Sequence, residues 1–337
     1  MPNTILLTPI LVSFLVTLLF IPYWIKRAKL VGLTGKDVNK SKKEVVSESG
    51  GITVLAGFVF GVLIYVTSLT FLLKVEENTV KIFALLNVII IVSLIGFVDD
   101  IFGWKIGLNK KTRFLTILLA SIPLIAINAG RSIISLPFNG QTDLGIFYPL
   151  ILIPLGIAGA TLAFNMLAGM NGLEAGQGII LLSALAIVSY FTGSPWLAVI
   201  SLCMVASLVS FLIFNFYPAK VFPGDSLTYS VGALIAIISI LGSFEKVAVF
   251  FFIPYILEVI IKSRGKLRIE SFALPKSDGS LALKNPKIHS LTHLSIYLMQ
   301  SLKIKPTEKK VVYSIWAFQI IIIVLGFIIF KQGIFLN

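Results

Sequence analysis

The sequence predicts an all-α membrane protein with about ten transmembrane helices. Hydrophobic residues occupy 57% of the 337 positions, and the mean hydropathy is +0.99. Only 13% of the residues are charged, whereas soluble domains contain roughly 25%. Apolar runs of about twenty residues recur along the whole chain, and this is the length that a membrane-spanning helix needs.

The apolar runs are expected to form a single polytopic membrane domain over residues 1–337. The ten segments are predicted at 3–24, 50–73, 80–98, 112–128, 147–163, 177–193, 195–215, 226–243, 246–262 and 311–330. The loops that carry the polar motifs are 25–49, 99–111, 164–176, 216–225 and 262–310.

The distribution of basic residues predicts the orientation in the membrane. These five loops, with the adjoining Arg113, hold 23 of the 28 lysines and arginines. By the positive-inside rule they are cytoplasmic, and both termini lie outside. Topology and anionic lipid headgroups explain the net charge of +13. Because no nucleic-acid-binding motif accompanies the charge, membrane lipids are expected partners and nucleic acid is not.

Two loops show local structure in their sequences. In the last cytoplasmic loop, 267–274 and 280–283 flank a Lys-Ser-Asp-Gly turn, which predicts a small hairpin. The leucine spacing over 290–302 then indicates an amphipathic helix on the membrane surface. On the outer side, Asn139 and Gly140 indicate a turn.

Adjacent carboxylates close the third apolar segment at its cytoplasmic end. Like charges raise each other's pKa unless a cation compensates. Negative charge at a helix C-terminus also opposes the macrodipole. Asp99 and Asp100 are therefore candidates for metal binding or proton transfer, and the alternative is a solvated helix end.

Two further motifs carry oxygen ligands. The segment 164–176 contains Asn165, Asn171 and Glu174 among glycines, which suits a hard cation or a uracil ring; the alternative is an Asn-capped loop. Asp225 follows Phe-Pro-Gly, just before the eighth segment, where it is a helix N-cap or a magnesium ligand.

The remaining motifs have simpler alternatives. Lys36-Asp37-Val38 and the later Glu48 belong to a basic juxtamembrane loop, and Lys111 is explained by topology alone. His289 and His293 are four residues apart, but two histidines and one distant cysteine do not complete a zinc shell.

Taken together, these motifs resemble the polyprenyl-phosphate N-acetylhexosamine-1-phosphate transferases. The likeness is closest to the eukaryotic and archaeal branch that makes GlcNAc-pyrophosphoryl-dolichol, and it extends from Lys36 to His293. Its most specific part is the run Leu-Ala-Gly-Met-Asn-Gly-Leu-Glu-Ala-Gly-Gln, and the Asp-Asp pair and Pro-Gly-Asp support it. Ten helices with both termini outside also match the family.

The resemblance implies a site with three groups of residues. The implied ligands of Mg²⁺, with Mn²⁺ as an alternative, are Asn165 and Asp225. The implied catalytic residues are Asp99, Asp100 and Lys111, with the lysine near the lipid phosphate. The implied substrate-binding residues are Lys36, Asp37, Val38, Glu48, Asn171, Glu174, Lys284, Lys287 and His289.

Some positions depart from the family pattern. Lys287 and His289 stand where arginines are expected, and Leu162 and Gly103 stand where some relatives have Asn. The bacterial branch that uses UDP-MurNAc-pentapeptide has an Asp-Gly at residues 171–174 and a triple-His motif in the last loop; this chain has neither. The absence of both bacterial features favours a simple UDP-HexNAc donor, with GlcNAc expected.

The expected reaction transfers GlcNAc-1-phosphate from UDP-GlcNAc to a dolichyl or other polyprenyl phosphate and releases UMP, in one step or in two. An alternative is the same chemistry with another UDP-HexNAc for a surface polysaccharide. A secondary transporter is the alternative from another class, but transporters place ionisable groups at the bilayer midplane. The expected location is an archaeal plasma membrane rather than the endoplasmic reticulum, and a homodimer is left open.

Overall fold

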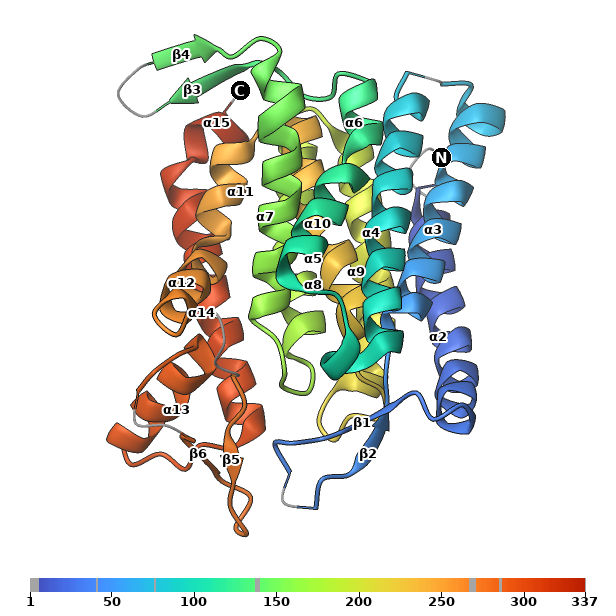
Figure 1. Cartoon of the computed structure of the whole chain (residues 1–337). Helices are drawn as coiled ribbons and strands as arrows, with labels where there is room; N and C mark the ends of the chain where they lie inside the picture. Colours follow the sequence, from blue (N-terminus) through green and yellow to red (C-terminus); the bar gives the residue numbers. More distant parts are fainter. Residues whose placement is uncertain are drawn as a thin grey trace.

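Long helices packed side by side form the body of the molecule (Figure 1). The computed structural model describes residues 6–40, 42–75, 77–136, 140–266, 271–284 and 287–336. Among these residues, eight helices are long and apolar enough to cross a membrane, which confirms the predicted fold class. They are α2 (Leu7–Leu30), α3 (Gly51–Thr67) with a π-helical extension (Ser68–Leu73), α4 (Thr79–Ile106), α7 (Ile153–Met166) after a π-helical turn (Tyr148–Leu152), α8 (Leu173–Phe191), α9 (Pro195–Asn215), α10 (Gly224–Gly242) and α14 (Glu308–Ile329).

The predicted fourth and ninth apolar segments each form a pair of shorter helices, and this accounts for the difference between ten expected segments and eight long helices. In α6 and α12, Pro123 and Pro254 occupy the first turn. Proline lacks an N–H group, so it is favoured where a helix begins and interrupts one that would continue. The pairs are α5 (Lys110–Ala120) with α6 (Ile122–Ala126), and α11 (Glu245–Phe251) with α12 (Ile253–Ser263).

Three two-stranded antiparallel sheets lie in the loops. The hairpin predicted in the last loop is present in a shorter form, and residues 267–270 of the prediction lie outside the described part of the chain. The amphipathic helix predicted over 290–302 is α13 (Leu291–Ser301). Asn139 also lies outside the described part, between two paired strands. The sheets pair β1 (Thr34–Lys36) with β2 (Val45–Ser47), β3 (Ile133–Leu136) with β4 (Gly140–Asp143), and β5 (Leu274–Pro275) with β6 (Leu281–Ala282).

The two ends of the helix bundle differ in character. In Figure 1, α2 begins and α14 ends toward the upper end, where the β3–β4 hairpin and the terminal helix α15 (Lys331–Phe335) also lie. The β1–β2 and β5–β6 hairpins and α13 lie at the lower end. The described chain ends thus share one end of the bundle. That the lower end faces the cytoplasm stays a prediction from the charge distribution.

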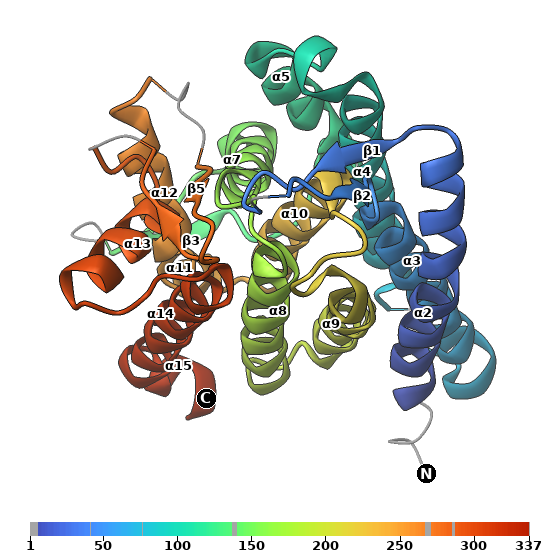
Figure 2. The same cartoon turned by 90° about the horizontal axis from the view of Figure 1, so that it is seen from below.

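Helix α10 is the centre of the bundle. In its 18-residue apolar stretch, 83% is buried within the protein. The corresponding stretches of α2 and α14 are only 22% and 28% buried. It packs against α3, α4, α7, α8 and α9, and from below it lies among them (Figure 2). The N-terminal end of this central helix points to the lower end of the molecule. Whatever is placed at its first turn is therefore surrounded by other helices.

A glycine allows α4 to approach the first turn of α10. A Cβ atom at Gly96 would lie 2.6 Å from the carbonyl carbon of Asp225 and 2.7 Å from the backbone nitrogen of Ser226. Both contacts are with backbone, which cannot rotate away. Gly96 thus sets the distance between the two helices next to the acidic residues of α4.

Replacing Gly96 with alanine is expected to destabilise the protein by about 1–3 kcal/mol, because overpacking forces the helices apart. The measurement is thermal unfolding of the detergent-purified protein. Gly159→Ala in α7 is the matched control, because a Cβ atom there meets nothing within 4 Å. Equal melting temperatures for the two variants would contradict the close approach.

Candidate active site

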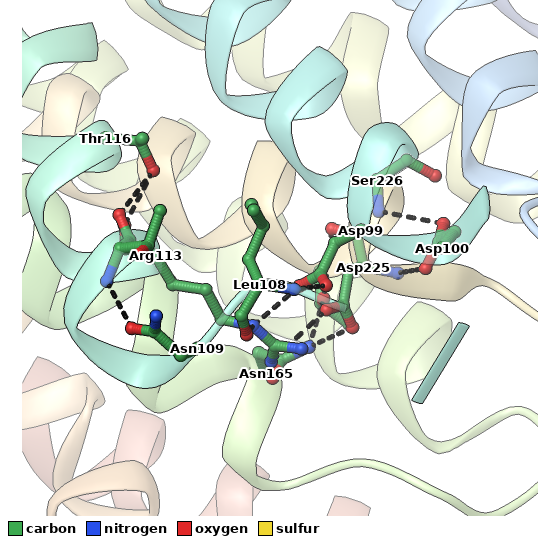
Figure 3. Close-up of polar contacts among 11 residues, drawn as sticks. Asp99, Asp100, Leu108, Asn109, Arg113, Thr116, Asn165, Asp225 and Ser226 are labelled. Carbon is green, nitrogen blue, oxygen red and sulfur yellow. Dashed lines mark hydrogen bonds and ion pairs between the residues drawn. The ribbon is translucent and has the colours of Figure 1, made fainter. Parts of the chain in front are cut away.

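Four helices bring acidic, amide and guanidinium groups together at the lower end of the bundle (Figure 3). Asp99 and Asp100 come from α4, Asn165 from the end of α7, Asp225 from the first turn of α10, and Arg113 from α5. The chain turns back after α4 because the backbone is non-helical at a glycine, residue 103, with a φ of 68°. This reversal directs α5 toward the carboxylates.

Asp99 is buried and fully engaged. The residue is 3% exposed. The Leu108 backbone N–H donates to Asp99 Oδ1 at 2.7 Å, and Arg113 Nε lies 2.6 Å from Oδ2. A charge buried this deeply needs such a partner, because desolvation otherwise favours its neutral form. Asp99 can therefore be buried as a carboxylate because it pairs with the guanidinium of Arg113.

Asp225 and Asn165 lie in direct contact, although they are 60 residues apart in the sequence. Asn165 Nδ2 donates to Asp225 Oδ1 at 2.7 Å and to Thr228 Oγ1 at 2.9 Å. Arg113 Nη1 lies 3.6 Å from Asp225 Oδ2. The structure thus brings together the two residues expected to hold a metal. Their amide and carboxylate oxygens are hard donors of the kind that magnesium prefers, and the Asp225 side chain is 23% exposed, so the residues fit that ion.

Asp100 caps the central helix. Its Oδ1 accepts a hydrogen bond from the Asp225 backbone N–H at 2.7 Å, and its Oδ2 accepts one from Ser226 N–H at 3.4 Å. A Cβ atom at Gly224 would lie 2.2 Å from Asp100 Oδ2, so only glycine leaves room for this carboxylate. The first amides of a helix favour an anion. The N-cap role, which was the alternative interpretation of Asp225, is therefore filled by Asp100, and the Asp225 side chain faces its neighbours Asn165 and Arg113.

A second polar group surrounds Asp37 and Asn171. Asn171 Nδ2 donates to Asp37 Oδ2 at 2.9 Å, and Lys40 Nζ lies 3.1 Å from the same oxygen. The Asn171 backbone N–H donates to Glu308 Oε1 at 2.7 Å. Sequence reasoning missed Glu308, because an acidic residue in the first turn of α14 is explained by the helix dipole alone.

The loop between α7 and α8 is fastened at several backbone atoms. Glu174 Oε1 accepts from the Gly169 N–H at 2.7 Å, and Asn215 Oδ1 accepts from the Gly172 N–H at 3.1 Å. Asn39 Nδ2 donates to the Gly169 carbonyl at 2.7 Å, and Asn39 Oδ1 accepts from Ala273 N–H at 3.3 Å. Asn39 therefore joins the first loop, this loop and the last loop. Glu174, expected to bind substrate, here supports its own loop.

The other expected residues of the first loop lie at the β1–β2 hairpin. Lys36 is exposed and Val38 is half-buried. The side chain of Glu48 packs against Gly35, where a Cβ atom would lie 2.2 Å from Glu48 Oε1. Burial raises the pKa of the Glu48 carboxyl group.

The cation that reaches the carboxylates is Arg113 rather than Lys111. Lys111 is exposed on the first turn of α5, while Arg113 is half-buried and pairs with both Asp99 and Asp225. The two positions are 200° apart on a helix with 3.6 residues per turn, so they face opposite sides. A helical-wheel comparison with the buried Ile117, four residues after Arg113, could have shown that Arg113 faces inward. The expected role of Lys111 near the lipid phosphate stays a prediction.

The last loop docks on α12. Lys284 and Lys287 are exposed, whereas His289 is only 8% exposed. Glu258 Oε2 accepts from the Leu291 N–H at 2.6 Å, and this carboxylate pairs with Lys262 at 3.3 Å. Glu258 lies within the ninth predicted apolar segment, 246–262. Its partners are structural and lie near the lower end.

Lys262 also connects this docking surface to the candidate metal ligands. Its Nζ donates to the carbonyl oxygen of Met166, the residue after Asn165. The end of α7 is thus held from α12 on one side and from α10 on the other.

Comparisons with known proteins identify a family and several relatives of this chain. The sequence profile of glycosyl transferase family 4 matches residues 82–243. A protein of Saccharolobus solfataricus is 39% identical over 96% of this chain and 96% of its own length, and one of Sulfolobus acidocaldarius is 36% identical over 95% of each. Both are provisionally named UDP-N-acetylglucosamine–dolichyl-phosphate N-acetylglucosaminephosphotransferase. A protein of Dictyostelium discoideum with that name is 30% identical over 73% of this chain and 68% of its own.

Asp100→Ala is expected to lower the free energy of unfolding by about 1–2 kcal/mol, because it removes the acceptors at the start of α10. Asp100→Asn keeps one side-chain oxygen and should recover most of that loss. Thermal unfolding in detergent measures both. An alanine variant as stable as the wild type would show that the cap contributes nothing.

Glu48 predicts a dependence of stability on pH. Because its pKa is higher in the folded protein, the folded state keeps the proton that the unfolded state loses above about pH 4.3. Stability from this residue is therefore present below that pH and is lost as the pH rises through the folded pKa. Glu48→Gln should show a smaller fall in melting temperature over this range. Glu77→Gln, at an exposed position, is the control; parallel curves for Glu48→Gln and wild type would contradict the raised pKa.

Proposed function

Because this chain belongs to glycosyl transferase family 4, we propose that it transfers GlcNAc-1-phosphate from UDP-GlcNAc to dolichyl phosphate. The single observation that supports this most strongly is the near full-length match to a relative with that enzyme name. The cluster of Asn165, Asp225, Asp99 and Arg113 at one end of the bundle supports it independently.

In the proposed reaction, an oxygen of the lipid phosphate attacks the β-phosphorus of UDP-GlcNAc. The bond from that phosphorus to the oxygen bridging the two phosphates breaks, and the bridging oxygen leaves with UMP. A new pyrophosphate links GlcNAc to the lipid. Both reactants are anions, so their meeting requires positive charge that is already in place.

The chain supplies part of that charge through Arg113, whose guanidinium lies between Asp99 and Asp225. Asn165 and Asp225 would hold Mg²⁺, with Mn²⁺ as an alternative. When bound, such an ion neutralises and orients the phosphates of the donor. Asp99 orients the guanidinium, and Asp100 holds the first turn of α10, on which Asp225 is carried.

Donor recognition is assigned to the second polar group. Asn171 and Asp37 offer amide and carboxylate atoms beside Lys40, which suits the edge of a uracil ring and its ribose. The acidic centre and this second polar group are joined by one continuous segment. Asn165 lies in the last turn of α7, and Asn171 follows six residues later. A nucleotide held at Asn171 would therefore direct its phosphates toward Asn165.

The location of the site suits the two substrates. A UDP-sugar is water-soluble, whereas the lipid phosphate lies at the bilayer surface. We assign the lower end of the bundle to the cytoplasmic side, because the loops there carry most of the basic residues. The archaeal relatives make a plasma membrane the proposed location.

The test is transfer of label from radiolabelled UDP-GlcNAc to dolichyl phosphate by the detergent-purified protein with Mg²⁺. Lipid-linked label and UMP are expected, both lost on adding EDTA. Asp225→Asn should reduce transfer by at least about a hundredfold, as loss of a group that stabilises charge does. Asp278→Asn, at an exposed turn, is the control.

Each outcome of this assay has a distinct meaning. Label from another UDP-HexNAc alone would keep the chemistry and replace GlcNAc as the donor. Full transfer by Asp225→Asn would remove the metal assignment. Absence of transfer with every donor and lipid, from folded protein, would contradict the proposed function.

A further inference from the structure

We infer that Arg113 is an internal counter-cation that competes with the divalent metal for Asp225. The inference rests on the proposed function, because it takes Asp225 as a metal ligand. It assigns to Arg113 a role in setting the affinity of the metal site, which is separate from any contact with substrate.

The contacts of Arg113 are unequal. Its Nε lies 2.6 Å from Asp99 Oδ2 and donates to the Leu108 carbonyl at 2.9 Å, whereas its Nη1 lies 3.6 Å from Asp225 Oδ2. The side chain of Asp99 is 1% exposed and that of Asp225 is 23% exposed. The guanidinium is thus anchored at the buried carboxylate and only loosely paired with the accessible one (Figure 3).

The helix that carries Arg113 is also fixed. The Asn109 side chain accepts from Thr112 N–H at 2.9 Å and caps the start of α5. Thr116 Oγ1 donates to the Arg113 carbonyl at 3.0 Å. These hydrogen bonds hold the backbone of α5 at Arg113. The position of the guanidinium next to Asp225 is therefore set by a helix and not by a loop.

Competition follows from charge. A divalent ion at Asp225 would stand beside the guanidinium, and like charges at this separation repel. A metal held by Asp225 would compete with Nη1 for the negative charge of this carboxylate. The shorter ion pair of Arg113 with Asp99 would not be involved. The planar fork of arginine can span both carboxylates, which the point charge of lysine cannot.

The experiment measures Mn²⁺ binding to the full-length, detergent-purified protein by electron paramagnetic resonance, without substrate. Arg113→Gln should lower the Kd for Mn²⁺ about five- to tenfold, the scale of a partly exposed ion pair. Arg113→Lys should give a Kd between those of Arg113→Gln and the wild type. Lys111→Gln removes the same charge from the exposed face of α5 and should leave the Kd unchanged.

A Kd for Arg113→Gln that equals or exceeds the wild-type Kd would overturn the inference, because the guanidinium would then assist the metal or ignore it. An equal decrease in Lys111→Gln would also overturn it, since the effect would be one of net charge. If Arg113→Gln does not fold, Arg113→Lys decides in the same way. Absence of Mn²⁺ binding in every variant would overturn the inference too.

The transfer assay separates this inference from the proposed function. A wild-type protein that transfers label but shows no change of Kd in Arg113→Gln would keep the function and remove the competition. A protein that binds Mn²⁺ more tightly in Arg113→Gln but transfers nothing would keep the competition at this site and remove the proposed reaction.

Discussion

The hydrogen bonds from the first amides of α10 to the Asp100 carboxylate are the constraint on which the site depends. The central helix begins among other helices, where its free N–H groups have little access to water and must find acceptors within the protein. Asp100 supplies them from α4, and Gly96 lets the two backbones come close enough. Fastened in this way, α4 and α10 place Asp99 next to Asp225. The acidic centre is therefore a consequence of how the bundle closes.

Bringing several acidic residues together has an electrostatic cost, and neighbouring groups of the site offset it. Asp99 is almost fully buried, and two further acidic residues, Asp100 and Asp225, lie in the same cluster. One guanidinium cannot balance all three. Arg113 neutralises the most buried of them, backbone amides satisfy Asp100, and Asp225 retains only an amide and a longer ion pair. The residue with the weakest compensation is the one best able to accept an external cation, which is why we assign the metal there.

Much of this arrangement could be predicted from sequence, and the limits have physical causes. Long apolar runs and the lysine distribution indicated the helices and the shared end of the termini, because the bilayer imposes length and orientation locally. Asn165 and Asp225 were expected together through the family resemblance. Which acidic residue caps α10, and which cation of α5 faces inward, depends on helix rotation and crossing geometry. Both depend on tertiary structure. The capping role of Asp100 and the ion pairs of Arg113 therefore became evident only in the folded structure. Glu308 was missed because the helix dipole alone explains an acidic residue in the first turn of a helix, and its contact with Asn171 exists only in the folded structure.

The two polar groups are best understood as one device, because a single loop joins them. Asn165 and Asn171 belong to one segment whose two ends are held by different elements: α10 and α12 hold the first, and the first loop and α14 hold the second. Asn39 adds the last loop to the same support. In the proposed reaction, these contacts would fix the distance between the nucleotide bound near Asn171 and the acidic centre. Transfer of a phosphoryl group depends on that distance, because a misplaced phosphate is no longer stabilised by the preorganised charges of the site.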